Sequence, residues 1–111
     1  MAGGARGTPA DLANASLRGL DLAKANLARA DCRQADLRGT ILSGATLTDA
    51  NLAGANFFKS VLDASDLAGA NLIGARFLNC AQLETTRNWQ SAFRDPDLAC
   101  GAPVPIIADP P

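Results

Sequence analysis

Histidine and tyrosine are absent from this sequence of 111 residues. Histidine is the commonest general base and metal ligand, so most enzyme and metal sites lose their usual residue. The glycines do not form a phosphate-binding loop, and no apolar run approaches the ~20 residues that a membrane-spanning helix needs. We therefore expect no catalytic residues, no metal or other cofactor, no small-molecule substrate and no membrane span.

The sequence also carries little net charge. Ten Lys and Arg residues and eleven Asp and Glu residues leave a formal charge of -1. Nucleic-acid-binding proteins usually show a basic stripe, whereas a protein that imitates a polyanion needs a strongly acidic surface. The charge therefore predicts neither nucleic-acid binding nor close mimicry of DNA.

Cysteine is scarce, with Cys32, Cys80 and Cys100 at distant positions. No CxxC or Cys/His cluster occurs, so the spacing supports neither a zinc site nor a disulfide framework. The first ten residues lack the apolar segment of a cleaved signal peptide. We expect reduced thiols in a cytoplasmic protein.

What the sequence does have is a period of five residues. Fourteen units of the form small–polar–large–x–x fill residues 10–79 without insertion or deletion, and eleven have Leu at the third position. This period fits neither a helix nor a flat strand. We interpret each unit as a short wall whose first and third residues point inward and whose second points outward. The last two residues, often Gly or Asn, then turn a corner.

These A(D/N)LxG-type units resemble the pentapeptide-repeat family, and the resemblance covers residues 10–79 without a gap. It implies an all-β fold, a right-handed quadrilateral parallel β-helix with four units in each coil. Successive coils would pair as parallel strands roughly 4.8 Å apart. We expect a flexible N-terminus over 1–9 and the β-helix over 10–84.

Residues twenty apart should then stack in columns on four faces. The outward columns of faces one, two and four are mostly polar, and we expect them to face water. They read Asp11, Asp31, Asn51 and Asn71 on face one; Ser16, Asp36, Asn56 and Arg76 on face two; Asn26, Thr46 and Asp66 on face four. Inward positions include Cys32, Cys80, Phe57 and Phe77, with Leu20 as an oversized exception that should swell the first coil.

Face three breaks this polar pattern. Its outward column reads Asp21, Ile41 and Val61, and the adjoining fourth-position column of face two contains Phe58 and Leu78. We predict an exposed apolar patch of Ile41, Phe58, Val61 and Leu78, a kind of surface that needs a cover or a partner.

After the repeat, residues 85–94 predict a short helix with a threonine N-cap. Trp89 and Phe93 lie four apart and would share one face of that helix. A solenoid must close its open end against edge pairing, so we expect a helical cap over 85–98 that lays both aromatics on the last coil. A Pro-rich tail over 99–111 would follow.

Three covers for the apolar patch are weighed, in this order. The chain's own tail could dock through Ile106 and Ile107, a homodimer could form through the C-terminal half, or another protein could bind. The function we expect is a non-enzymatic scaffold for protein–protein interaction. Two alternatives stay open: a topoisomerase-binding protein of the DNA-mimic type that acts on gyrase, as the family resemblance suggests, and an accessory structural subunit of a larger complex.

Overall fold

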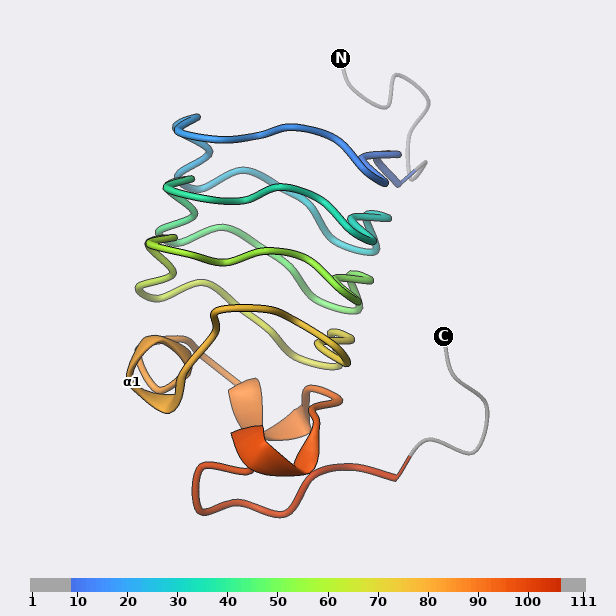
Figure 1. The fold of residues 1–111 in the computed structure, drawn as a ribbon, viewed down its shortest axis with the longest axis vertical. Coiled ribbons are helices and arrows are strands. Elements are labelled where there is room, and N and C mark those ends of the chain that lie inside the picture. The colour runs from blue at the N-terminus through green and yellow to red at the C-terminus, as the bar shows by residue number, and fades with distance from the viewer. Residues whose placement is uncertain (1–8, 107–111) are drawn as a thin grey trace.

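The structure is a computed structural model that describes residues 9–106. Most of the N-terminal segment expected to be flexible therefore lies outside the described residues. Figure 1 shows a stack of similar coils, closed at its C-terminal end by short helices. These are α1 (Cys80–Leu83) and two 3-10 helices, η1 (Trp89–Ser91) and η2 (Pro96–Leu98).

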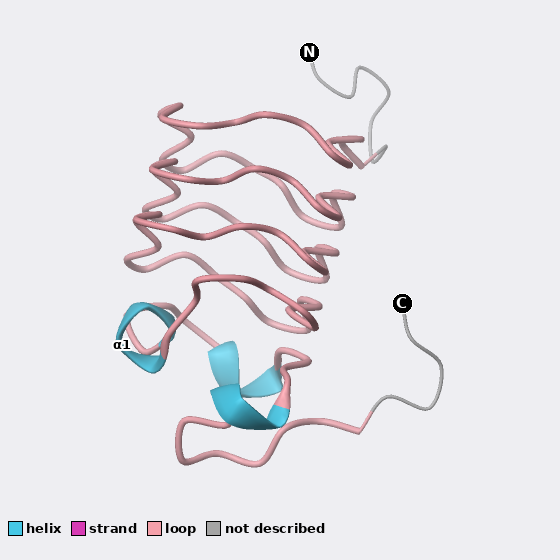
Figure 2. Cartoon of the chain, viewed as in Figure 1, coloured by secondary structure: helices cyan, strands magenta, loops and turns pink. Residues whose placement is uncertain are grey.

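The walls of the stack are joined by parallel bridges between residues twenty apart. On face one, Asp11 pairs with Asp31, Asp31 with Asn51 and Asn51 with Asn71. The other three faces follow the same register, so the expected coil of twenty residues and four walls is confirmed. Each wall is so short that one bridge per unit replaces an extended strand, and Figure 2 accordingly draws the coils as loops.

Each corner of the first thirteen units is a tight turn in which the fifth residue of the unit adopts a left-handed backbone conformation. In the first corner, the N–H of Ala15 donates to the carbonyl of Leu12 at 3.0 Å, and Asn14 has φ 63°. A positive φ at the third residue of the turn only is the pattern of a type II turn. Glycine is frequent there because it adopts that conformation without strain.

The polar second position has a structural role besides facing water. The Oδ1 of Asp21 accepts the N–H of Ala23 at 3.0 Å, and the Oδ1 of Asn71 accepts the N–H of Ile73 at 3.0 Å. Asp and Asn side chains reach the backbone two residues ahead in this way. The preference for Asp and Asn follows from this bond, which satisfies an N–H group at the entrance to the corner.

Inside the coils, leucines from the third positions and small residues from the first positions form the core. Leu42, Leu52, Leu67 and Leu72 are almost completely buried, as is Phe57. Alternating large and small side chains let the narrow interior reach the density of a protein core. Cys32 is also buried, as its inward position predicts.

The N-terminal coil is less well covered than the rest of the stack. Leu12, Leu17, Leu22 and Leu27 are only partly buried against the core. Leu20 is 47% exposed, so it lies largely on the surface rather than swelling the interior. Its exposure agrees with the incomplete cover of the whole first coil.

Beyond the repeat, the chain continues two of the four walls. Arg87 forms a parallel bridge with Asp66, and Phe93 forms one with Asn71. The continuous helix predicted over 85–94 is therefore absent, and the short 3-10 helix η1 (Trp89–Ser91) is the helical part of this range. Trp89 packs against the core, but it shares no helix with Phe93 because Phe93 is a wall residue.

The helix starts earlier because residues 79–82 form a capping box. The Oδ1 of Asn79 accepts the N–H of Gln82 at 2.8 Å, and the Oε1 of Gln82 accepts the N–H of Asn79 at 3.1 Å. The side-chain amide of Gln82 also donates to the carbonyls of Phe57 (3.2 Å) and Ser60 (3.3 Å). The reciprocal bonds fix the start of the helix. The two bonds from the Gln82 amide attach α1 to the coil that contains Phe57 and Ser60.

Arg94 is the centre of the C-terminal segment. Its side chain is 2% exposed, and its guanidinium lies 5.1 Å from the centroid of the Trp89 ring. It donates five hydrogen bonds of 2.8–3.1 Å to the backbone carbonyls of Gln90, Ala92, Leu98, Ala99 and Pro103. A buried charge needs such partners, so Arg94 ties the turns of this segment together.

Cys80 and Cys100 form a disulfide with their Cα atoms 5.6 Å apart. The expectation of reduced thiols at these two positions is therefore wrong. The two are separated by 20 residues in the sequence, and the fold of the segment after α1 brings them together. The free thiol is Cys32.

Candidate functional site

Large exposed apolar side chains gather along the edge between faces two and three. We call this set the apolar strip; it comprises Leu20, Ile41, Phe58, Val61 and Phe77. Among the described residues, Ile106 is the one other large apolar side chain with such exposure. Most of the large exposed apolar side chains are therefore concentrated on one edge of the prism.

Ile41 and Val61 form the straight part of the apolar strip. They pair through a parallel bridge on face three, and the N–H of Ile41 donates to the carbonyl of Leu20 at 2.9 Å. The outward column of this wall therefore holds two apolar residues in register, Ile41 and Val61, below Asp21, and Leu20 lies beside this column at the preceding residue. At this outward position the other faces carry polar side chains, several of which bond to a corner N–H.

Leu78 does not belong to the exposed patch, contrary to the prediction. It is 9% exposed, whereas Phe77 is 62% exposed. Phe77 has φ 58°, so the chain turns two residues earlier than in the preceding units. The two side chains thereby exchange places: Leu78 enters the core, and the Phe77 ring lies edge-on to Phe58 with centroids 5.6 Å apart.

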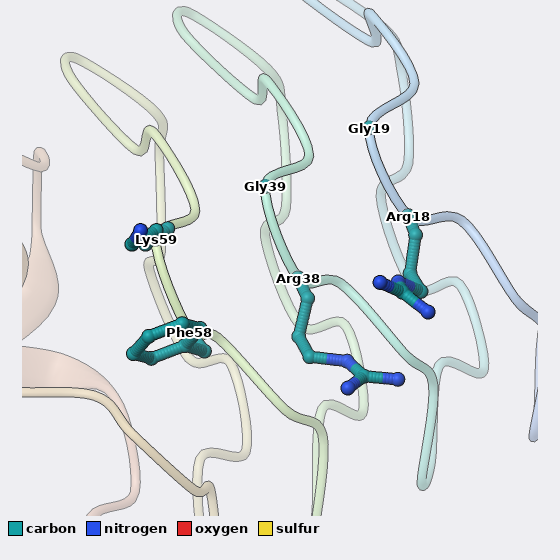
Figure 3. Close-up of a pocket in the computed structure, with 6 residues that line it drawn as sticks. All are labelled: Arg18, Gly19, Arg38, Gly39, Phe58 and Lys59. Carbon is teal, nitrogen blue, oxygen red and sulfur yellow. The ribbon is translucent and has the colours of Figure 1, made fainter.

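A shallow groove runs along the same edge (Figure 3). Its volume is about 480 Å³, and it is lined by Arg18, Gly19, Arg38, Gly39, Phe58 and Lys59. Gly19 and Gly39 stack at the corner, where a Cβ on Gly39 would lie 4.0 Å from the Gly19 nitrogen. The missing side chains hollow the edge, and the neighbouring arginines border the hollow.

Three cations border this groove, and we call Arg18, Arg38 and Lys59 the cationic row. Arg38 donates to Asp36 through Nε at 2.8 Å and through Nη2 at 2.7 Å. This pairing, with a contribution from Arg18, lowers the pKa of the Asp36 carboxyl to about 2. The Lys59 ammonium lies 5.4 Å from the centroid of the Phe58 ring, a cation–π arrangement.

The described part of the tail leaves the apolar strip open. Ile106 is 94% exposed, so the prediction that it docks on face three is wrong, and Ile107 lies outside the described residues. The hydrogen bond from Arg94 to the Pro103 carbonyl holds the approach to the tail at the base of the stack (Figure 1). Ile106 therefore covers no part of face three.

Away from the groove, the described residues show one close ion pair and one buried thiol but no cluster of titratable groups. Asp31 bonds to Arg33 at 2.6 and 2.7 Å, and burial raises the pKa of the Cys32 thiol to about 11. Within residues 9–106 no three His, Cys, Asp or Glu side chains gather where they could hold a metal ion. The same range contains no helix with the length and hydropathy of a membrane span.

Sequence reasoning missed several residues of this surface. Reading columns gives the stacked Gly19 and Gly39 beside Arg18 and Arg38, so the groove was detectable from the register. Phe77 was not detectable, because nothing in the unit ARFLN marks the early turn. The sequence marks Leu20 as an oversized first-position residue and predicts it inside the coil, whereas its side chain is 47% exposed.

Comparison with known proteins matches this geometry. The family model described as pentapeptide repeats fits residues 10–44 and 40–79. This match covers more than half of the chain and confirms the right-handed quadrilateral β-helix. No curated protein matches the sequence.

Solved structures similar to this chain include three pentapeptide repeat proteins. One, named Rfr23, is from the cyanobacterium Cyanothece 51142, with 32% identity, 78% of this chain and 58% of that chain covered, and a TM-score of 0.40. One from Nostoc Pcc 7120 has 25% identity, coverages of 81% and 73%, and a TM-score of 0.40. One from the Arabidopsis thaliana thylakoid lumen has 25% identity, coverages of 89% and 66%, and a TM-score of 0.38. The chain thus spans 58% of the length of Rfr23.

Proposed function

The chain belongs to the pentapeptide-repeat family, and on that premise we propose that it is a non-enzymatic scaffold that binds another protein. The contact surface is the edge between faces two and three. The observation that carries the proposal is the apolar strip, which gathers five large apolar side chains on one edge of an otherwise polar surface. Contiguous exposed apolar surface of this kind marks interaction sites in soluble proteins.

The backbone pairing of the coils does not require apolar side chains at Ile41 and Val61. The backbone bonds of face three, such as that from Leu42 N–H to the carbonyl of Val61 at 2.8 Å, do not depend on what side chain points outward. Face four shows that a polar residue serves at the same place, because Thr46 bridges to Asp66 there. Apolar side chains at Ile41 and Val61 therefore serve a contact outside the chain.

A DNA-mimic function receives less support from the surface. Such mimicry requires a field of uncompensated negative charge. Asp31 and Asp36 are instead paired with Arg33 and Arg38 two residues ahead. The accessory-subunit alternative would use the same apolar strip and differs only in the permanence of the contact.

The disulfide bears on where such a scaffold works. Disulfides persist in oxidising compartments and are rare in the cytosol. The bond between Cys80 and Cys100 favours an oxidising compartment over the cytoplasmic location expected from the cysteine spacing. We include this location in the proposal.

The experiment is affinity capture from an extract of the native source, followed by calorimetry with the purified captured protein. Three proteins are compared: wild type, Ile41→Thr/Val61→Thr and the control Thr46→Asn on face four. Wild type and Thr46→Asn should bind equally, and the double variant should lose at least tenfold in affinity, because large apolar anchors dominate interfaces. Equal binding by all three would overturn the proposal, and so would a wild-type complex containing only copies of this chain.

A further inference from the structure

We infer that the partner binds through an acidic segment that also carries large apolar side chains, lying along the edge with its carboxylates toward face two. This inference rests on the proposed function and specifies the chemistry of the partner. Its basis is the juxtaposition of the apolar strip with the cationic row on one edge of the prism. Figure 3 shows the cationic row beside Phe58, the member of the strip that lines the groove.

The cations at this edge are available to a partner. In the part of the chain that the structure describes, neither Arg18 nor Lys59 takes part in an ion pair. The positive charge of Arg38 is partly offset, because its guanidinium donates two hydrogen bonds to the Asp36 carboxylate. Lys59 at one end of the groove and Arg18 at the other therefore make no direct ion pair, although Arg18 also interacts with the Asp36 carboxylate, and Arg38 between them is shared with it.

The charge is distributed unevenly about the apolar strip. The far corner of face three carries Lys24 and Asp63, whose charges offset each other, and Asp21 lies in the outward column of the face itself. Positive charge therefore predominates only on the face-two side. An acidic segment gains attraction there, whereas a basic segment would meet repulsion, and such complementarity selects partners.

The shape of the edge suits an extended backbone. The two stacked glycines leave the corner bare, so a chain can approach the groove floor closely, and Phe58 closes the end of the groove. Coils stack about 4.8 Å apart, so the four coils of the strip span about 14 Å. An extended peptide rises about 3.4 Å per residue, so roughly four to five residues would cover the strip.

A peptide fits this surface better than a nucleic acid does. Single-stranded nucleic acids bind to basic grooves with aromatic platforms on which successive bases stack. Here Phe58 and Phe77 stand edge-on to each other, and the rest of the apolar strip is aliphatic. Aliphatic side chains match the apolar side chains of a peptide, and they offer no platform for stacked bases.

The first test is selection of a random peptide display library on the intact wild-type protein, with the disulfide formed. Enriched peptides should combine Asp or Glu with Phe, Leu, Ile or Met. Enrichment of basic or uncharged peptides would overturn the acidic inference, as would the absence of any enriched peptide. A fluorescent single-stranded oligothymidine serves as a competing probe, and its binding at this edge in place of the peptides would also overturn the inference.

The second test measures one enriched synthetic peptide by fluorescence anisotropy against three variants. Arg18→Glu/Lys59→Glu should weaken binding at least tenfold, because charge reversal turns attraction into repulsion. The control Lys24→Glu should leave binding within about twofold, because this residue lies at the far corner. Ile41→Thr/Val61→Thr should also weaken binding tenfold or more.

The outcomes separate the two proposals. Loss of binding in Ile41→Thr/Val61→Thr but not in Arg18→Glu/Lys59→Glu overturns the acidic partner and leaves the apolar contact of the scaffold in place. Unchanged binding in Ile41→Thr/Val61→Thr places the peptide elsewhere and counts against both. Circular dichroism of each variant shows whether it folds.

Discussion

The repeat and the C-terminal cap are stabilised in opposite ways. In residues 10–78 most units contribute the same few features, a bridge, a turn and an inward leucine. In residues 79–106 the order depends on contacts that occur once: Gln82, Arg94 and the disulfide between Cys80 and Cys100. Repetition spreads stability over many equivalent units, whereas a cap built on single contacts should fail when one of them is lost.

The sharpest test of that contrast is Arg94→Ala. Its loss leaves five carbonyls of the cap without their donor, so we expect a loss of roughly 4 kcal/mol in the free energy of unfolding. Arg94→Lys keeps the charge but loses the planar set of donors, so its free energy of unfolding should lie between those of wild type and Arg94→Ala. Urea denaturation measures both, and a loss below about 1 kcal/mol would show that Arg94 does not organise the cap.

Removing the disulfide should cost somewhat less. Cys80→Ser/Cys100→Ser opens a loop with a sequence separation of 20 residues, and loop-closure entropy predicts a loss of about 3 kcal/mol. A reducing agent should produce the same shift in wild type and none in the double variant. Hydrogen exchange should show the loss confined to the cap, so uniform loss across the coils would contradict the separation of the two regions.

Within the repeat, one corner can be improved. Ala64 has φ 61° and is exposed, and a left-handed conformation is unfavourable for a residue with a Cβ. Ala64→Gly should raise the free energy of unfolding by roughly 0.5 to 1 kcal/mol. Ala68→Gly is the control, because Ala68 has no positive φ and the change should be destabilising. Loss of stability in Ala64→Gly would mean that the corner carries no strain.

The smallest effect concerns pH. The hydrogen bonds from Arg38 lower the pKa of the Asp36 carboxyl to about 2. A carboxyl with a depressed pKa in the folded state contributes stability that is complete above about pH 4 and disappears as the pH falls to about 2. Carboxyl NMR should give a titration midpoint near pH 2, and Arg38→Gln should move it up toward the range of an ordinary aspartate. An unchanged midpoint would remove Arg38 as the cause.

The two regions also differ in how far the sequence predicts them. The period of five predicts the coils, the inward position of Leu52 and Phe57, and the outward columns, because one register repeats fourteen times. The sequence of the cap has no five-residue repeat from which its structure could be predicted. Its helix begins at a capping box outside the expected range, and Arg94 looks like any surface arginine until the chain folds around it.

The candidate site contains residues that the sequence columns predict and residues that they do not. Ile41, Phe58 and Val61 follow from the columns and are exposed as predicted. Leu78 and Phe77 exchange roles because the last corner turns early, a backbone event that no sequence column records. The pairing of Cys80 with Cys100 is likewise a consequence of the folded cap, since spacing alone does not bring two distant residues together.

The central claim is that the apolar strip exists for contact and not for folding. The thermal unfolding midpoint of Ile41→Thr/Val61→Thr tests it most directly, with the wild type measured in parallel. We expect a change equivalent to no more than about 0.5 kcal/mol, as for surface substitutions in general. A loss of roughly 2 kcal/mol or more, the size seen when a core side chain is truncated, would make these residues part of the fold's own support and contradict the account.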